Sequence, residues 1–341
     1  MLVIRPAIDS DVDQLFSISA ATGPGMTSMP ADRSMWEARL QKSAESFSTT
    51  PPECSGTYFM VLEDTNSGMI AGSTAIYTEI GRKHPFYSYK LSTLVNYSQN
   101  LDRTISHQIL HLVNDYTGAT EIGSLYLAPA YRRDGNGSFV SRARYLLLAG
   151  LRERFADIVI AEMRGWQNSA GNSPFWEHLG KKFFGLAFEN ADYMNAVSGT
   201  QFISDLMPRY PVYVDLLPET AQAVIGKPHK DSAKAMSLLV REGFHFADYV
   251  DIFDGGPTVQ CRTDDIHSVQ AVRVHEVTRI ENDTCLANDD AYILANDRMD
   301  NYRIVRQRAR IDGDRIILGA GASEALDVST GDQISALGTN K

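Results

Sequence analysis

The stretch "LYLAPAYRRDGNGSFVSRARYLLLAG" (residues 125–150) puts an apolar strand, a loop rich in arginine and glycine, and an amphipathic helix in direct succession. The loop has the spacing Arg132-x-x-Gly135-x-Gly137, and a helix is expected over residues 139–154. Glycines allow left-handed backbone and close approach of a ligand. Backbone N–H groups at a helix start also attract anions. The loop alone fits two interpretations, a cradle for phosphate groups or a surface turn with solvated arginines.

Outward from this loop, hydrophobic periodicity and turn residues predict an alternation of strands and helices. The first half is expected to hold a strand at 2–7, a helix over 9–23, a hairpin over 56–81, a helix over 104–116, strands at 121–130 and 157–165, and a short helix from 173 ending at Gly180 with an aromatic strand after it. The second half is expected to hold helices within 201–208 and 219–244, a strand pair over 245–262 and short strands beyond 264.

This order predicts an α/β fold, with a mixed twisted sheet flanked by helices and the glycine loop at a strand-to-helix junction. At 341 residues the chain is long enough for two domains. We place them at 1–195 and 196–341, the second ending in a small β-rich tail. The run "LLVREGFHF" resembles "HLGKKFFGL" in form, which indicates that the second half partly repeats the first.

The composition argues against several classes of protein. With a net charge of −10, the chain is not expected to have the basic face that nucleic-acid binding needs. An acidic protein is better suited to a cationic small substrate. The sequence shows no signal peptide and no apolar run long enough to span a bilayer. The three cysteines, Cys54, Cys261 and Cys285, have no metal-ligand spacing and fit a reducing cytoplasm. We therefore expect a cytoplasmic protein with no membrane or nucleic-acid partner.

Histidines give no metal signal either. His107 and His111 lie four residues apart in the expected helix over 104–116, so both would share one helix face. The metalloprotease pattern requires glutamate after the first histidine, and Gln108 stands there instead. We expect a structural role for this pair, and neither a metal ion nor a prosthetic group in the protein.

The context of the glycine loop favours the phosphate cradle. A strand, helix, hairpin, helix and strand precede the loop, and in this respect the chain resembles the GNAT acyl-CoA transferases, whose glycine loop binds the CoA pyrophosphate. The runs "IRPAIDSDVDQL" and "SPFWEHLGKKFF" also look like the opening and the late helix of that fold. This general resemblance covers roughly residues 1–190.

Longer runs resemble a narrower group, the arginine N-succinyltransferase family, over most of the chain to about residue 262. These runs are "TGPGMTSMP", "LYLAPAYRRDGNG", "AEMRG", "SPFWEHLGKKFF", "LMPRYPVY", "AVIGKPH" and "REGFHFADYVDIFDGGPT". The resemblance implies transfer of the succinyl group of succinyl-CoA to the α-amino group of L-arginine, or in some members L-ornithine, in arginine catabolism. It also implies an oligomer, either of identical chains or with a related subunit.

The resemblance also implies roles for particular residues of the acyl-donor site. The backbone of Leu125 and Leu127 would pair with the pantetheine arm of succinyl-CoA. The CoA pyrophosphate would lie on the glycine loop, held by Arg132, Arg133, Gly135 and Gly137. His229, in "GKPHKDSAKAM", matches the position of the family's proton donor, and a histidine changes its charge near neutral pH.

The acceptor needs carboxylates for its guanidinium group, and the succinyl group needs a cation. Glu162, Asp251 and Asp254 are the acidic candidates, and Arg164 is a candidate for the succinyl carboxylate because its planar fork fits a carboxylate. No cysteine has a partner histidine nearby in sequence, so we expect direct attack by the amine without a covalent intermediate.

Two alternatives stay open at this point. A GNAT enzyme with another acyl donor or another amine would show the same loop and the same order of elements. A non-catalytic CoA-binding protein could keep the cradle and lack the chemistry. The choice between arginine and ornithine as acceptor is also open.

Overall fold

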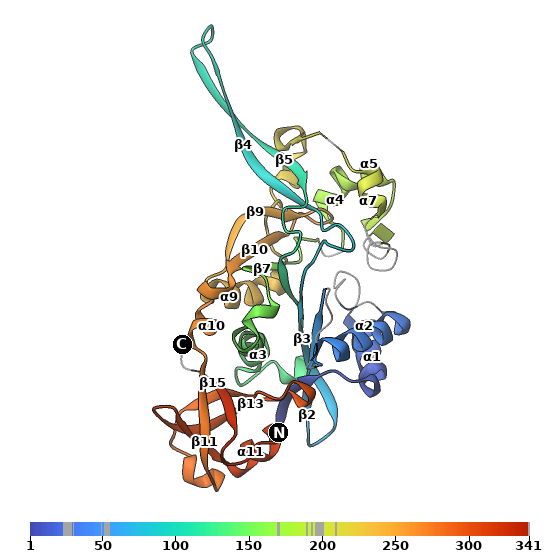
Figure 1. Cartoon of the computed structure of the whole chain (residues 1–341). Helices are drawn as coiled ribbons and strands as arrows, with labels where there is room; N and C mark the ends of the chain where they lie inside the picture. The colour runs from blue at the N-terminus through green and yellow to red at the C-terminus, as the bar shows by residue number, and fades with distance from the viewer. Residues whose placement is uncertain are drawn as a thin grey trace.

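The computed structural model describes residues 1–22, 29, 31–48, 50, 55–168, 171–188, 190–191, 194, 201–208 and 210–339. Cys54 and most of "TGPGMTSMP" lie outside these residues. The described strands form a mixed sheet of 15 strands, with helices packed along it (Figure 1). The predicted α/β class is confirmed.

The first elements follow the predicted order of strand, helix and hairpin. They are β1 (Leu2–Pro6), α1 (Val12–Thr22), α2 (Arg33–Ser46), β2 (Thr57–Asp64) and β3 (Met69–Tyr77). In the β2–β3 turn, Gly68 has a φ of 68°, a left-handed conformation that glycine adopts without strain. The hairpin over residues 56–81 is therefore confirmed, and the turn chemistry that predicted it is present.

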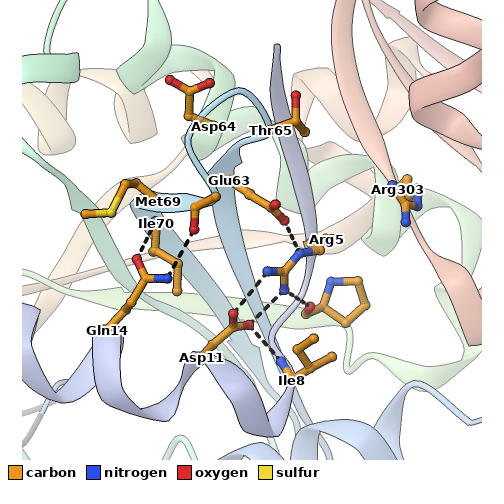
Figure 2. Close-up of polar contacts among 12 residues, drawn as sticks. Arg5, Ile8, Asp11, Gln14, Glu63, Asp64, Thr65, Met69, Ile70 and Arg303 are labelled. Carbon is orange, nitrogen blue, oxygen red and sulfur yellow. Dashed lines mark hydrogen bonds and ion pairs between the residues drawn. The ribbon is translucent and has the colours of Figure 1, made fainter.

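Polar side chains tie these first elements together, as Figure 2 shows. Arg5 on β1 contacts Glu63 on β2 and donates from Nη1 to Asp11 Oδ2 at 2.7 Å. Gln14 on α1 bridges to the β2–β3 hairpin, because its side chain donates to the Gly68 carbonyl at 3.1 Å and accepts from the Ile70 N–H at 2.9 Å. These contacts fix α1 against β1 and the β2–β3 hairpin.

The predicted helix over residues 104–116 is wrong. These residues belong to β5 (Arg103–Val113), which pairs antiparallel with β4 (Ser88–Ser98) along its whole length. The hairpin projects from the body of the protein as a long arm (Figure 1). The threonine, the two isoleucines and the valine of β5 favour the extended backbone. β4, which the sequence pattern did not reveal, supplies the partner strand. His107 contacts Asp215 in this setting.

The glycine loop lies between β6 (Thr120–Leu127) and α3 (Asn136–Gly150), and β7 (Ile158–Glu162) follows, as predicted. The expected aromatic strand after Gly180 is wrong. The chain instead forms α4 (Pro174–His178) and α5 (Gly180–Phe184). Trp176 and Phe184 stack with their ring centroids 5.4 Å apart, so the aromatic residues of this segment pack together between two helices.

The second half contains helices, a strand pair and a β-rich end, as predicted. Its elements are α7 (Gln201–Leu206), β8 (Val212–Tyr213), α8 (Glu219–Gln222), α9 (Ala233–Arg241), β9 (His245–Asp251), β10 (Pro257–Arg262), α10 (His267–Ala271), β11 (Arg273–Glu281), β12 (Ala291–Asn296), β13 (Ile304–Asp312), β14 (Arg315–Gly319), α11 (Ala320–Leu326) and β15 (Gln333–Gly338). In the described part of the chain, no helix is long and apolar enough to cross a membrane.

Strands from distant parts of the sequence alternate in the sheet, whose order is β12-β15-β11-β14-β13-β1-β2-β3-β6-β7-β10-β9-β4-β5-β8. The β-rich end joins the body through antiparallel pairing of β13 with β1. On the other side, β10 pairs with β7 and β9 pairs with β4. Strands from both sides of residue 195 therefore share one sheet, and the division of the chain at residue 195 stays a prediction.

We expect the substitution Gly180→Ala to destabilise the protein by about 1–3 kcal/mol, because overpacking of a filled core forces neighbours out of place. A Cβ at Gly180 would lie 2.2 Å from the Trp176 ring, which is fully buried. The free energy of unfolding is measured by urea titration. Gly150→Ala is the control, since a Cβ there meets nothing within 4 Å. Equal stability of both variants would contradict the close packing of Gly180 on Trp176.

Candidate active site

Two parallel strands that separate from each other form the centre of the site. β6 and β7 pair at Thr120 with Val159 and at Glu121 with Ile160, and no further pairs follow between these two strands. On its other side, β6 has a register shift against β3 near Ser124, whose φ is 49°. Such a bulge re-aims the local backbone. The result is an open wedge whose β6 side carries Leu125 and Leu127.

The glycine loop follows β6 at the open end of this wedge. Asp134 and Gly135 have φ values of 52° and 72°, and Gly135 is the N-cap residue of α3. A left-handed residue directly before a helical one is the backbone arrangement of an anion-binding nest, and the N–H groups in the first turn of a helix attract anions. A Cβ at Gly137 would meet nothing within 4 Å, so this residue faces open space. The loop therefore has the shape that a phosphate group needs.

The two predicted arginines lie at the rim of the loop with exposed side chains. Arg132 donates from Nε to the Leu127 carbonyl at 2.9 Å, which connects the loop to the end of β6. Arg133 lies 3.6 Å from Asp134 across an exposed ion pair. Exposed pairs of this kind contribute little to stability, so both guanidinium groups can turn towards a bound anion at low cost.

One cleft of about 1000 Å³ joins the loop to the wedge. The predicted donor-site and acceptor-site residues all line it. They are Leu125, Leu127, Arg132, Arg133, Gly135, Gly137, Glu162, Arg164, Asp251 and Asp254. The opposite wall comes from the segment that contains Lys230 and from α9. The structure thus brings together residues that lie more than 100 positions apart in sequence.

Two partly buried carboxylates, Glu121 and Glu162, lie at the inner end of the cleft. Burial raises the pKa of Glu121 to about 7, although Arg39 lowers it in part. Burial, together with the charges of Asp251 and Glu121, raises the pKa of Glu162 well above its usual value. Among the described residues, neither carboxylate has a hydrogen-bond donor. Buried carboxylates without donors are costly unless a cation neutralises them, so this end of the cleft suits a cationic ligand.

Glu121 was not predicted from the sequence. It begins the run "EIGSLYLAP", in which a glutamate at the start of a strand is typical of an exposed position. Its surroundings include β7, with which it pairs, and the charge of Arg39 on α2, and neither is near it in sequence. Glu121 lies three residues before the bulge at Ser124, and this position points to a functional role only after the structure has revealed the bulge.

Asp251 and Asp254 line the same wall but are engaged by the backbone. Asp251 Oδ1 accepts from the N–H groups of Phe253 and Asp254 at 2.7 and 2.8 Å. Asp254 accepts from Gly165 at 2.6 Å and from Gly256 at 2.8 Å. These bonds hold the turn after β9 against the end of β7. Burial and their mutual proximity still raise the pKa of Asp254.

Arg164 and His229 are neighbours at the end of β7. The His229 N–H donates to the Arg164 carbonyl at 2.7 Å, and the Arg164 side chain donates to Gln167. Arg164 lines the cleft; His229 is buried behind Lys230, Asp231 and Ser232, which line it. Burial and the positive charge of Arg164 lower the pKa of His229.

A hydrogen bond shows which ring nitrogen of neutral His229 carries the proton. Its Nδ1 accepts from the Asp231 N–H at 3.2 Å, so Nδ1 carries a lone pair and Nε2 carries the hydrogen. Nε2 is therefore the atom through which this side chain can donate. In the described part of the chain, no group of three or more histidine, cysteine, aspartate or glutamate residues could hold a metal ion.

Comparisons with known proteins agree with this geometry. A family model described as "Arginine N-succinyltransferase beta subunit" matches residues 2–268, and one described as its C-terminal domain matches residues 273–338. The arginine N-succinyltransferase of Escherichia coli O139:H28 (strain E24377A / ETEC) is 38% identical over 334 residues, which is 98% of this chain and 96% of the relative. The enzyme of the same name from Citrobacter koseri is 37% identical over the same share of each chain.

A solved structure agrees over the full length. The arginine/ornithine succinyltransferase subunit AI from Pseudomonas aeruginosa superposes with a TM-score of 0.90 and 33% identity, covering 100% of this chain and 99% of that chain. Sequence and fold thus match across both the body and the β-rich end. The chain is an acyltransferase and belongs to the arginine N-succinyltransferase family.

Proposed function

We propose that the chain transfers the succinyl group of succinyl-CoA to the α-amino group of L-arginine, as a step of arginine catabolism. One observation carries this proposal: a single cleft has the glycine loop at one end and the partly buried carboxylates of Glu121 and Glu162 at the other. A CoA thioester requires the first feature and a cationic amino acid requires the second. Family membership supplies the succinyl group as the one transferred.

The donor would bind along β6. Its pyrophosphate would lie on the N–H groups at the start of α3, with Arg132 and Arg133 turning towards it. Its pantetheine arm would run into the wedge, where β6 no longer pairs with β7 and the backbone at Leu125 and Leu127 is available to it. Arg164, which lines the cleft beyond the wedge, would meet the succinyl carboxylate.

The acceptor would bind at the inner end of the cleft. Glu121 and Glu162 would neutralise the guanidinium and ammonium groups of L-arginine, while Asp251 and Asp254 hold the wall in shape through their backbone hydrogen bonds. Ionised carboxylates near the ammonium group also provide a place for the proton that this group must lose before it attacks. L-Ornithine would bring a shorter cation to the same carboxylates.

The chemistry would be direct attack in a complex of both substrates. The neutral α-amine adds to the thioester carbonyl, its nitrogen loses a proton to solvent as the C–S bond breaks, and the CoA thiolate leaves and takes up a proton. The protonated ring of His229 would donate that proton from Nε2 and keep its hydrogen on Nδ1, which lies 3.6 Å from the Asp231 carboxylate. Burial and Arg164 lower the pKa of His229, which makes its protonated form a stronger acid towards the thiolate.

The direct test is thiol release from succinyl-CoA and, separately, from acetyl-CoA, with L-arginine and L-ornithine as acceptors. We expect release that requires succinyl-CoA together with arginine or ornithine. The ratio of kcat/KM for the two acceptors gives the amine preference. Release only with acetyl-CoA, or CoA binding without any release, would overturn the proposal and leave one of the two alternatives raised by the sequence.

Replacing the inner carboxylates should weaken acceptor binding and stabilise the protein. We expect Glu121→Gln and Glu162→Gln to raise the KM for L-arginine at least tenfold, with little change in the KM for succinyl-CoA. The pKa of Glu121 is about 7 in the folded protein and ordinarily 4.5. Stability linked to this group therefore falls as the pH rises from 4.5 through 7. At pH 8 both variants should melt at a higher temperature than the parent.

Glu153→Gln is the matched control for this pair, because Glu153 is exposed and lies outside the cleft. It should change neither the KM for arginine nor the melting temperature. An unchanged KM for arginine in both inner variants would show that the cation of the acceptor binds elsewhere.

His229→Asn separates a catalytic role of this residue from a structural one. Asparagine is a favoured N-cap residue, so its side-chain oxygen can still accept from the Asp231 N–H, while the Nε2 donor is lost. We expect kcat to fall by about 100-fold or more, with the KM values and the melting temperature close to those of the parent. An unchanged kcat would remove His229 from the mechanism.

A further inference from the structure

Arg306, on β13 of the β-rich C-terminal unit, reaches the glycine loop. Its Nη2 donates to Asn136 Oδ1 at 3.0 Å, and its guanidinium lies over the Phe139 ring at 5.5 Å. A Cβ built on Gly135 would lie 3.1 Å from Arg306 Nη1. The guanidinium therefore lies against the first turn of α3, at the loop where the phosphates of the acyl donor are expected.

The positive charge of Arg306 is only weakly neutralised by neighbouring groups at the glycine loop. Within the described residues it forms no ion pair, and its Nε and Nη1 have no hydrogen-bond acceptor. Asp134, on the loop itself, is near enough to act on it electrostatically, while burial lowers the pKa of Arg306. A cation at the positive end of a helix is unfavourable, and an anion bound there would offset both charges.

The neighbouring arginines of β13 differ from Arg306 in this respect. Arg308 and Arg310 point to the same side of the strand two and four residues further on, where both contact Asp289 within the C-terminal unit. Both are exposed, whereas Arg306 is half-buried against the loop. Of these three, Arg306 alone contacts α3, so its placement is not explained by the packing of the β-rich unit.

We infer that Arg306 is a phosphate-binding residue of the acyl-CoA site, contributed by the C-terminal unit across its contact with the glycine loop. The inference rests on the proposed function of that loop. The ligand class is a phosphate group of CoA, either the pyrophosphate or the 3′-phosphate. In a chain with a net charge of −10, such local cations have to provide the attraction for a polyanionic donor.

The test measures dissociation constants by titration calorimetry for CoA and for 3′-dephospho-CoA, on the full chain. We expect Arg306→Gln to weaken CoA binding about tenfold, and Arg306→Lys to weaken it less, since lysine keeps the charge and loses the fork. Arg308→Gln is the matched control and should bind as the parent does. An equal loss of affinity for both ligands would show that Arg306 contacts the pyrophosphate. A loss of affinity for CoA alone would show that it contacts the 3′-phosphate.

A third variant, Gly137→Val, separates failure of this inference from failure of the proposed site. A Cβ at Gly137 meets nothing within 4 Å, so there is room for a side chain, and a valine would occupy the space proposed for a bound phosphate. If Gly137→Val weakens CoA binding and both Arg306 variants bind within twofold of the parent, the inference on Arg306 is overturned. If Gly137→Val also binds CoA normally, the glycine loop is not the binding site of the acyl donor, and that part of the proposed function is overturned.

Discussion

The parallel pairing of β6 with β7 extends over two residue pairs, Thr120 with Val159 and Glu121 with Ile160, and it joins the two halves of the sheet. Buried groups support this short junction: Thr120 Oγ1 accepts from the Ala156 N–H at 2.9 Å. Past the junction the strands separate, and that separation creates the cleft. Longer pairing between β6 and β7 would strengthen the sheet and close the site, so these two strands pair only briefly where the chemistry is expected.

The cleft has opposite electrostatic requirements at its two ends. The glycine loop presents N–H groups and arginines, while the inner end presents carboxylates whose pKa values are raised. The uncompensated charge at each end costs free energy when no ligand is bound, and a substrate of the opposite charge would offset that cost. Perturbed pKa values are often found at functional sites for this reason. In the proposed function, the free energy that the fold gives up at Glu121 and Glu162 would be recovered as affinity for a cationic amino acid.

Sequence reasoning found the parts of the site whose signal is local. The loop at Gly135 follows from spacing and turn chemistry, and the α/β order follows from hydrophobic periodicity. It failed where the environment is supplied from a distance: β5 needs β4 to be a strand, and the surroundings of Glu121 include β7 and the charge of Arg39 on α2. Arg306 lies in an arginine-rich run, "RIVRQRARI", in which no sequence feature distinguishes the residue that reaches α3. Asp254 was predicted as a substrate contact, and its oxygens turn out to accept from backbone N–H groups.

The pairing of β1 with β13 also has a consequence for how the chain folds during synthesis. Val3 and Ile4 pair with Val305 and Ile304, which are synthesised about 300 residues later. Until then, one edge of β1 has no partner, and such an open edge invites association with other chains. Contacts so distant in sequence also slow folding. This edge of β1 therefore stays unprotected until β13 of the C-terminal unit has been made.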